Sequence, residues 1–208
     1  MTRLLKRRNR SGTTIIEFVL ITALVLIPLL MGSLVVGFNL IRAIQANQIN
    51  RDSGHMFARG VDFSTSTGAG NRAVLTYMAP RLAFSPPTGV VILSAIQYVG
   101  PNTCNQCPNE YHAVFLQQLM IGNSALLNSY FGTVAAGSMT NDGTGTVKNP
   151  YTDTSVQADA ILNVIPIVDG VSMGDGEIAY TSETYFSSTD FDIAGFLPPS
   201  GVYCRAIF

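Results

Sequence analysis

Three cysteines are the first residues whose type and spacing could do chemistry. Cys104 and Cys107 form a Cys-x-x-Cys motif, and Cys204 stands alone. A zinc knuckle needs two further soft ligands, and the sequence has no second such motif and no paired histidine. A thioredoxin-like redox site lies where a strand leads into a helix, whereas this motif falls between two expected strands. We therefore favour a disulfide that clamps a loop over free thiols, metal binding or redox chemistry, and we expect Cys204 to be a small buried hydrophobe.

Two further polar groups invite a catalytic or metal interpretation. Asp52, Ser53 and His55 lie within four positions of one expected helix, where nucleophile, base and orienting group do not readily reach a catalytic geometry. The segment 169–177 combines carboxylates with glycine bends, as calcium sites do, but its spacing differs from a twelve-residue EF-hand loop. We favour a solvated helix face and a pair of turns, with calcium as the open alternative. The sequence thus predicts no enzyme, no metal site and no cofactor.

Glu17 is the acid with the most unusual sequence surroundings. The 24 residues that follow it, from Phe18 to Ile41, carry no charge and are rich in Leu, Val and Ile. A helix needs roughly 20 apolar residues to cross a bilayer, so this segment is long enough. An acid inside a membrane costs about 2.5–3.5 kcal/mol at the bilayer centre on insertion scales, and less near an edge. An acid in such a segment is a functional hypothesis by default. Taken alone, however, Glu17 is better explained as a carboxylate that simply reaches the membrane interface.

The charge distribution indicates how such a segment would be oriented. Residues 1–12 carry five basic groups and no acid, which leaves seven Lys and Arg against thirteen Asp and Glu in the remainder. The apolar run is longer than that of a secretory signal peptide, and no small-residue cleavage site follows it, so we expect a retained anchor. The positive-inside rule keeps the basic leader in the cytoplasm and places the rest outside. The acidic remainder argues against nucleic-acid binding.

The stretch from Arg7 to Phe18 resembles the processing site of type IV prepilins. In that family a short basic leader ends in Gly, and Glu stands at the fifth position of the mature chain before a long apolar helix. The resemblance implies cleavage by a prepilin peptidase between Gly12 and Thr13. It also implies that Glu17 pairs with the new N-terminal amine of a neighbouring pilin-like subunit. An opposite charge in a low-dielectric surrounding would offset the desolvation of that carboxylate.

Within this superfamily, the opening of the apolar run is most similar to TadE-like minor pilins, also called pseudopilins, of tight-adherence pili. The similarity rests on β-branched residues followed by Glu17 and Phe18 and then an apolar run. It implies a bacterial inner-membrane subunit with a single span, acting in the biogenesis or adhesion of a type IV-like pilus or secretion assembly. The alternative is a membrane-anchored adhesin or ligand-binding ectodomain that is displayed on a pilin-like helix.

The elements that position these residues divide the chain into three expected parts. Residues 1–12 form the leader, 13–60 a transmembrane and weakly amphipathic helix that stops at Gly60, and 61–208 an extracytoplasmic domain. Helical spacing over 71–83 predicts a short second helix, and 132–150 has loop composition. Alternating or β-branched runs predict strands at 90–99, 111–121, 160–168, 177–187 and 201–208. The expected fold class is α+β, with the long helix packed on an antiparallel sheet of four or five strands.

Overall fold

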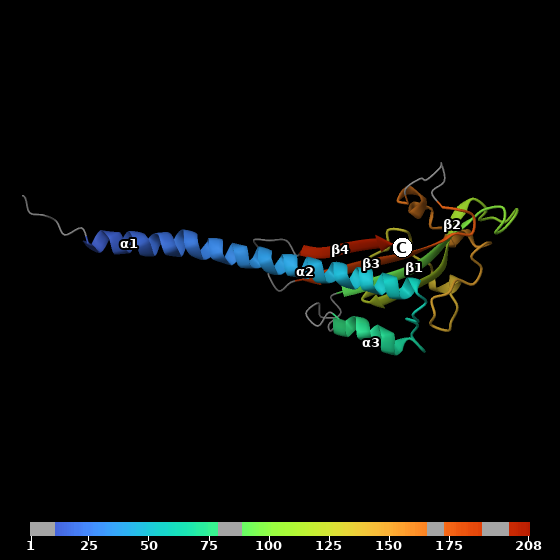
Figure 1. The fold of residues 1–208 in the computed structure, drawn as a ribbon, viewed down its shortest axis with the longest axis horizontal. Helices are drawn as coiled ribbons and strands as arrows, with labels where there is room; N and C mark the ends of the chain where they lie inside the picture. The colour runs from blue at the N-terminus through green and yellow to red at the C-terminus, as the bar shows by residue number, and fades with distance from the viewer. Residues whose placement is uncertain (1–10, 79–88, 166–172, 189–199) are drawn as a thin grey trace, which may run out of the picture. The chain divides into compact units, whose positions relative to one another are not determined.

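The computed structural model describes residues 11–78, 89–165, 173–188 and 200–208, and Figure 1 shows the arrangement of these elements. A long helix begins the described part, and a four-stranded antiparallel sheet follows, which confirms the α+β prediction. The helices are α1 (Ser11–Ile21), a π-helical turn (Thr22–Leu26), α2 (Ile27–Ala58) and α3 (Ala69–Met78). The strands are β1 (Gly89–Val99), β2 (His112–Gly122), β3 (Ile178–Ser188) and β4 (Ser200–Ile207).

The sheet has the strand order β2-β1-β3-β4, and every neighbouring pair is antiparallel. Strand β1 is almost wholly buried because it is central and apolar side chains cover both of its faces. The register between β1 and β2 shifts at Ala95 and Ile96, where Leu116 is the extra residue of a β-bulge. A buried apolar cluster lies on each face, and the second is formed with the loops that follow β2.

The chain forms two compact units whose boundary falls between Ile41 and Arg42, so the second half of α2 belongs to the folded domain. This half of α2 packs on the sheet through Ala46, Ile49 and Phe57, each at most 5% exposed. Leu75 of α3 is buried in the same cluster. Burial of these spaced side chains fixes the domain part of α2 more strongly than its helix propensity could.

Two polar residues lie in the middle of this interface. Asn50 and Ser53 are completely buried. The Asn50 amide donates through its nitrogen to the hydroxyls of Ser182 and Thr184 at 2.9 Å, and its oxygen accepts from the Ala206 N–H at 3.2 Å. The Ser53 hydroxyl lies 3.3 Å from that of Ser182. Hydrogen bonds therefore tie one helix position to strands β3 and β4.

The predicted stop of the long helix is confirmed. Helix α2 ends at Ala58, and Gly60 has a φ of +81°, which an L side chain rarely adopts. The Gly60 N–H donates to the Phe57 carbonyl at 2.9 Å and the Val61 N–H to the Met56 carbonyl at 3.0 Å. This pair of bonds is a Schellman motif, which satisfies carbonyls that would otherwise lack donors at the helix end.

One predicted strand is wrong, and one predicted helix end lies outside the described residues. Residues Asp159–Asn163 form a 3-10 helix where we expected a strand over 160–168, of which 166–168 are not described. Ile161 is fully buried in the second cluster, so its apolar character reflects core packing rather than strand pairing. The other four strands are confirmed. Helix α3 ends the described part of its segment at Met78, so the predicted stretch 79–83 is outside it.

Candidate functional site

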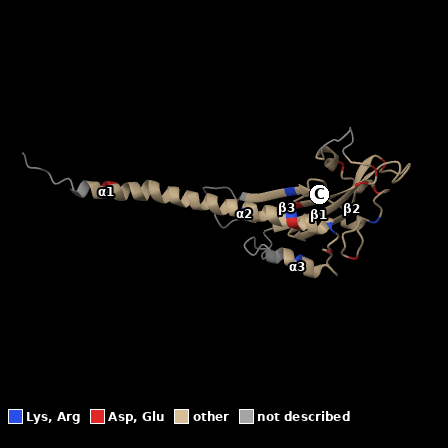
Figure 2. Ribbon diagram, viewed as in Figure 1, with Lys and Arg blue, Asp and Glu red and all other residues tan. Residues whose placement is uncertain are grey.

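The helix surface before the folded domain is apolar and exposed. From Ile15 to Ile44 the large hydrophobic side chains of α1, the π-helical turn and α2 are exposed, several by more than 60%, with the exception of Val35 at 6%. In Figure 2 this stretch is drawn almost entirely in the colour of uncharged residues. One helix in the described part of the chain, Thr14–Ala58, is long and apolar enough to cross a membrane. An apolar surface of this length is unusual for a helix facing water, so it marks a contact with lipid or with other helices.

A π-helical turn interrupts this surface directly before Pro28. The five residues Thr22–Leu26 have π-helical hydrogen bonding, and α2 begins at Ile27. Proline has no N–H to donate to the preceding turn, and its ring crowds the carbonyl four residues earlier. A local widening of the helix relieves that crowding, which is how membrane helices accommodate proline. The Thr22 hydroxyl also donates to the Phe18 carbonyl at 2.8 Å.

Glu17 lies in α1, six positions after the first residue of the helix, Ser11. Its side chain is exposed among the apolar residues, and it makes no ion pair with any residue that the structure describes. Gly12 and Thr13 belong to the same helix, and Thr13 stands four positions before Glu17 in the sequence. Phe18 is 70% exposed beside it. Residues 1–10 of the basic leader lie outside the described part, so cleavage at Gly12 stays a prediction.

The cysteine motif occupies the loop between β1 and β2, as expected. The sulfur atoms of Cys104 and Cys107 are paired as a disulfide, and their Cα atoms lie 5.9 Å apart. Formation of this disulfide in the exported protein stays a prediction. The loop is tightly turned, because Gln106 and Tyr111 have φ values of 62° and 68°. Cys204 is partly buried in β4 and packs against the first cluster, and burial raises the pKa of its thiol.

Asp175 belongs to the segment for which calcium was an alternative. Its carboxylate accepts the backbone N–H groups of Gly100, Asn102 and Thr103 at 2.6–3.2 Å and the Thr103 hydroxyl at 2.6 Å. These hydrogen bonds, above all that from the hydroxyl, lower the pKa of the Asp175 carboxyl. The carboxylate thus clamps the start of the cysteine loop. Within the described ranges no group of three His, Cys, Asp or Glu side chains could hold a metal ion.

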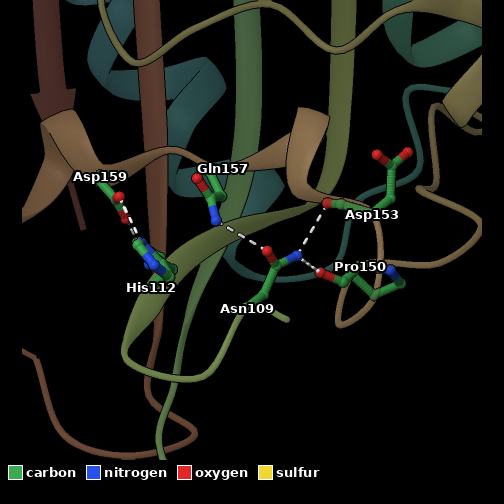
Figure 3. Close-up of polar contacts among 7 residues, drawn as sticks. Asn109, His112, Pro150, Asp153, Gln157 and Asp159 are labelled. Carbon is green, nitrogen blue, oxygen red and sulfur yellow. Dashed lines mark hydrogen bonds and ion pairs between the residues drawn. The ribbon is translucent and has the colours of Figure 1, made fainter. Parts of the chain in front are cut away.

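A second polar network ties the loops after β2 to the start of that strand and to the loop that precedes it (Figure 3). The buried Asn109 amide donates to the carbonyls of Pro150 and Asp153 at 2.8 and 2.9 Å and accepts from the Gln157 side chain at 2.9 Å. His112 and Asp159 lie 2.7 Å apart, and the Asp159 carboxylate also accepts the Ala113 N–H. No hydroxyl or thiol hydrogen-bonds to this imidazole in the described part of the chain. We therefore assign the pair to loop attachment.

Glu183 is a buried carboxylate that the sequence analysis did not single out. It is completely buried in β3 and accepts hydrogen bonds from the Tyr130 N–H at 2.9 Å, the Tyr203 hydroxyl at 2.6 Å and the Ser129 hydroxyl. The Arg205 guanidinium lies 4.2 Å from the centre of the Tyr130 ring. The carboxylate fixes the loop around Tyr130 on the sheet. The sequence did contain a signal for this site, because Glu183 is a charged residue at a strand position that faces the interior of the domain.

No family model, curated protein or solved structure matches this chain. Function is therefore inferred from the residues of this chain and from their geometry. Within the described residues, the feature on which a function can be built is the exposed apolar helix with a single acid, Glu17, near its start.

Proposed function

We propose that this chain is a membrane-anchored, pilin-like subunit that assembles with other subunits through its N-terminal helix. The helix crosses the inner membrane once, with the basic leader in the cytoplasm and the sheet domain outside. A prepilin peptidase removes residues 1–12 by cutting between Gly12 and Thr13. The mature subunit then acts in the biogenesis or adhesion of a tight-adherence pilus or related secretion assembly.

The observation that carries this proposal is the position of Glu17 on the exposed apolar surface. Leu20 and Ile21, three and four positions further along α1 and therefore on the same helix face, are 57% and 61% exposed, so they provide an apolar contact surface beside the carboxylate. A carboxylate in such surroundings is stabilised when a cation approaches it. Cleavage before Thr13 would create a positive amine on each subunit, and the Glu17 of a neighbouring subunit could pair with it.

Substitution of Glu17 tests the proposal. Glu17→Gln keeps the size of the side chain and its hydrogen bonding but removes the charge, and Glu17→Ala removes both. We expect both variants to insert in the membrane and to be cleaved, because an uncharged residue is easier to bury. We expect both to lose co-purification with other pilin-like subunits. Crosslinking and co-purification from membranes of the native host measure this loss.

A matched control separates the charge from the position. Ser33 is another exposed polar residue of the apolar stretch, and its hydroxyl donates to the Leu30 carbonyl of its own helix. Ser33→Ala should leave assembly unchanged. Normal assembly of Glu17→Gln would contradict charge pairing, and normal assembly of Glu17→Ala as well would reduce Glu17 to an interfacial carboxylate.

A further inference from the structure

A cavity of about 340 Å³ that opens widely to the surface lies in the domain beside β2, and none of its lining residues belongs to the helix from Ser11 to Ala58. Three segments that are distant in sequence form its walls. They are the region from Thr65 to Arg72, the β2 residues Gln118–Met120 and the loop from Ala136 to Gly145. Cavities of 300–1,000 Å³ are the usual size for small-molecule sites.

Backbone hydrogen bonds hold these walls in place. The Thr65 N–H donates to the Gly143 carbonyl at 3.1 Å, and the Gln118 N–H donates to the Gly145 carbonyl at 2.9 Å. Gly145 has a φ of +71°, and a Cβ at this position would lie 2.2 Å from the Gln118 carbonyl oxygen. Only glycine allows the loop to approach the strand so closely. The cavity is therefore formed before any ligand arrives.

Among the described residues that line this cavity, Arg72 is the one cation. Its Nε donates to the Phe63 carbonyl at 2.7 Å and one terminal nitrogen donates to the Met120 carbonyl at 2.9 Å. A guanidinium has five N–H donors, so three remain after these two bonds. Arg72 makes no ion pair within the residues that the structure describes, and burial lowers its pKa. The two backbone carbonyls fix the direction in which the remaining donors can bind an anion.

The other walls define what kind of anion fits. Met120, Met139 and Ala136 provide apolar surface, and Thr140 and Asn141 provide polar groups. Asp142 lies in the same loop, but its carboxylate accepts from the side chains of Thr140 and Thr144 at 2.6 Å and from the Thr144 N–H. The described lining residues include one guanidinium, and residues 42–208 contain seven Lys and Arg against twelve Asp and Glu. This charge distribution favours a monoanion over a phosphate.

We propose that this cavity binds the carboxylate of a small molecule that carries an apolar group of a few carbons. The Arg72 donors take the carboxylate oxygens in a forked hydrogen bond, and the methionine side chains adapt to the apolar group. The site is independent of the helix proposal, because Glu17 takes no part in it.

Isothermal titration of the full chain in detergent micelles tests the site with N-acetyl-leucine at millimolar concentrations. N-acetyl-leucinamide is the matched control, since it has nearly the same shape and lacks the charge. We expect the acid to bind and the amide to bind at least roughly tenfold more weakly, because hydrogen bonds to charged groups are worth about 1.5–3 kcal/mol. Equal binding of acid and amide, or no binding of the acid, would overturn the proposal.

Three variants place the binding in the cavity. Arg72→Gln removes the cation and Ala136→Trp fills the cavity from an exposed position, so the second variant does not depend on the contacts that Arg72 makes with the backbone. Each should weaken binding of the acid at least roughly tenfold. Arg51→Gln, at an exposed position on α2, should leave it unchanged. Unchanged affinity in both cavity variants would locate the acid elsewhere and overturn the assignment.

Discussion

The two halves of the long helix place polar and apolar side chains in opposite ways. Before Ala46 the helix exposes large apolar side chains such as Leu24 and Val36, at 72% and 68%. Beyond Ala46 the same helix buries Asn50 and Ser53 completely against the sheet. Water as the only surrounding would disfavour the first arrangement, and an apolar partner would disfavour the second. The difference indicates two functions in one helix, namely contact with lipid or helices and attachment to the domain.

The buried polar contacts in the second half of the long helix determine where α2 sits on the sheet more than they add to the stability of the domain. An apolar contact tolerates sliding by a fraction of a turn, whereas the Asn50 amide has to face Ser182, Thr184 and Ala206 at once. Apolar residues on either side, including Ile49 and Phe57, are buried in the first cluster. Such polar pairs have a directional geometry that fixes the position of α2 on β3 and β4.

The largest effect that separates the two halves is expected from Gly12→Val. A branched side chain beside the scissile bond should block cleavage between Gly12 and Thr13 completely. Intact-mass measurement in a host with an active prepilin peptidase would then show the full chain. Thermal unfolding of the domain should not change, because residues 12 and 13 lie outside the unit that begins at Arg42.

Gly37→Val is the matched control for this experiment. Gly37 is a glycine of the same helix, and a Cβ built there meets no atom within 4 Å. This variant should be cleaved normally. An unprocessed Met1 terminus in the unsubstituted chain from such a host would contradict the prepilin assignment itself.

Local sequence patterns predicted most of the helices and strands but not the polar contacts between them. The apolar run after Glu17, the stop at Gly60 and four strands follow from local composition and periodicity, and the structure has a helix and strands at these places. The weak amphipathic pattern of the long helix does not distinguish Ile44, which is 51% exposed, from Asn50, which is buried. Hydrophobicity alone cannot identify a buried amide whose partners lie more than 130 positions away.

The Arg72 cavity and the Glu183 contacts could not be predicted for the same reason. Arg72 reaches Met120 across 48 positions, and Glu183 reaches Tyr130 across 53. Local periodicity contains no information on such pairs, because they depend on the strand order and on the path of the loops. The predicted strand over 160–168 was wrong for a related reason. Ile161 is apolar because it packs in the second cluster, and the sequence pattern cannot distinguish such packing from the pairing of a strand.

An intermediate effect is expected when the buried polar contact of α2 is removed. Asn50→Ala leaves the hydroxyls of Ser182 and Thr184 without their amide partner and should lower the free energy of unfolding by about 2–3 kcal/mol. Asn47→Ala is the matched control, because Asn47 is exposed one turn earlier on α2. Alanine favours helix, so this control should be neutral or slightly stabilising. Chemical denaturation of the full chain in micelles measures both, and equal effects would contradict a role for Asn50 in registry.

The smallest effect concerns the acid sensitivity of the cysteine loop. Hydrogen bonds hold the pKa of Asp175 below its ordinary value of 3.8, so the folded state prefers the charged carboxylate. The contribution of Asp175 to stability is therefore present above the ordinary pKa and is lost as the pH falls through the lowered value. Asp175→Asn should lower the unfolding temperature at neutral pH, and the difference from the unsubstituted chain should shrink below pH 3.8.

The matched control for Asp175 is an acid that makes no such contacts. Asp52 is exposed on α2, and Asp52→Asn should change the unfolding temperature little at any pH. A constant difference between Asp175→Asn and the unsubstituted chain from neutral to acidic pH would mean that the charge of Asp175 does not matter. Asparagine keeps one acceptor oxygen. The hydrogen bonds from Gly100 and Thr103 would then need only that oxygen and not the negative charge.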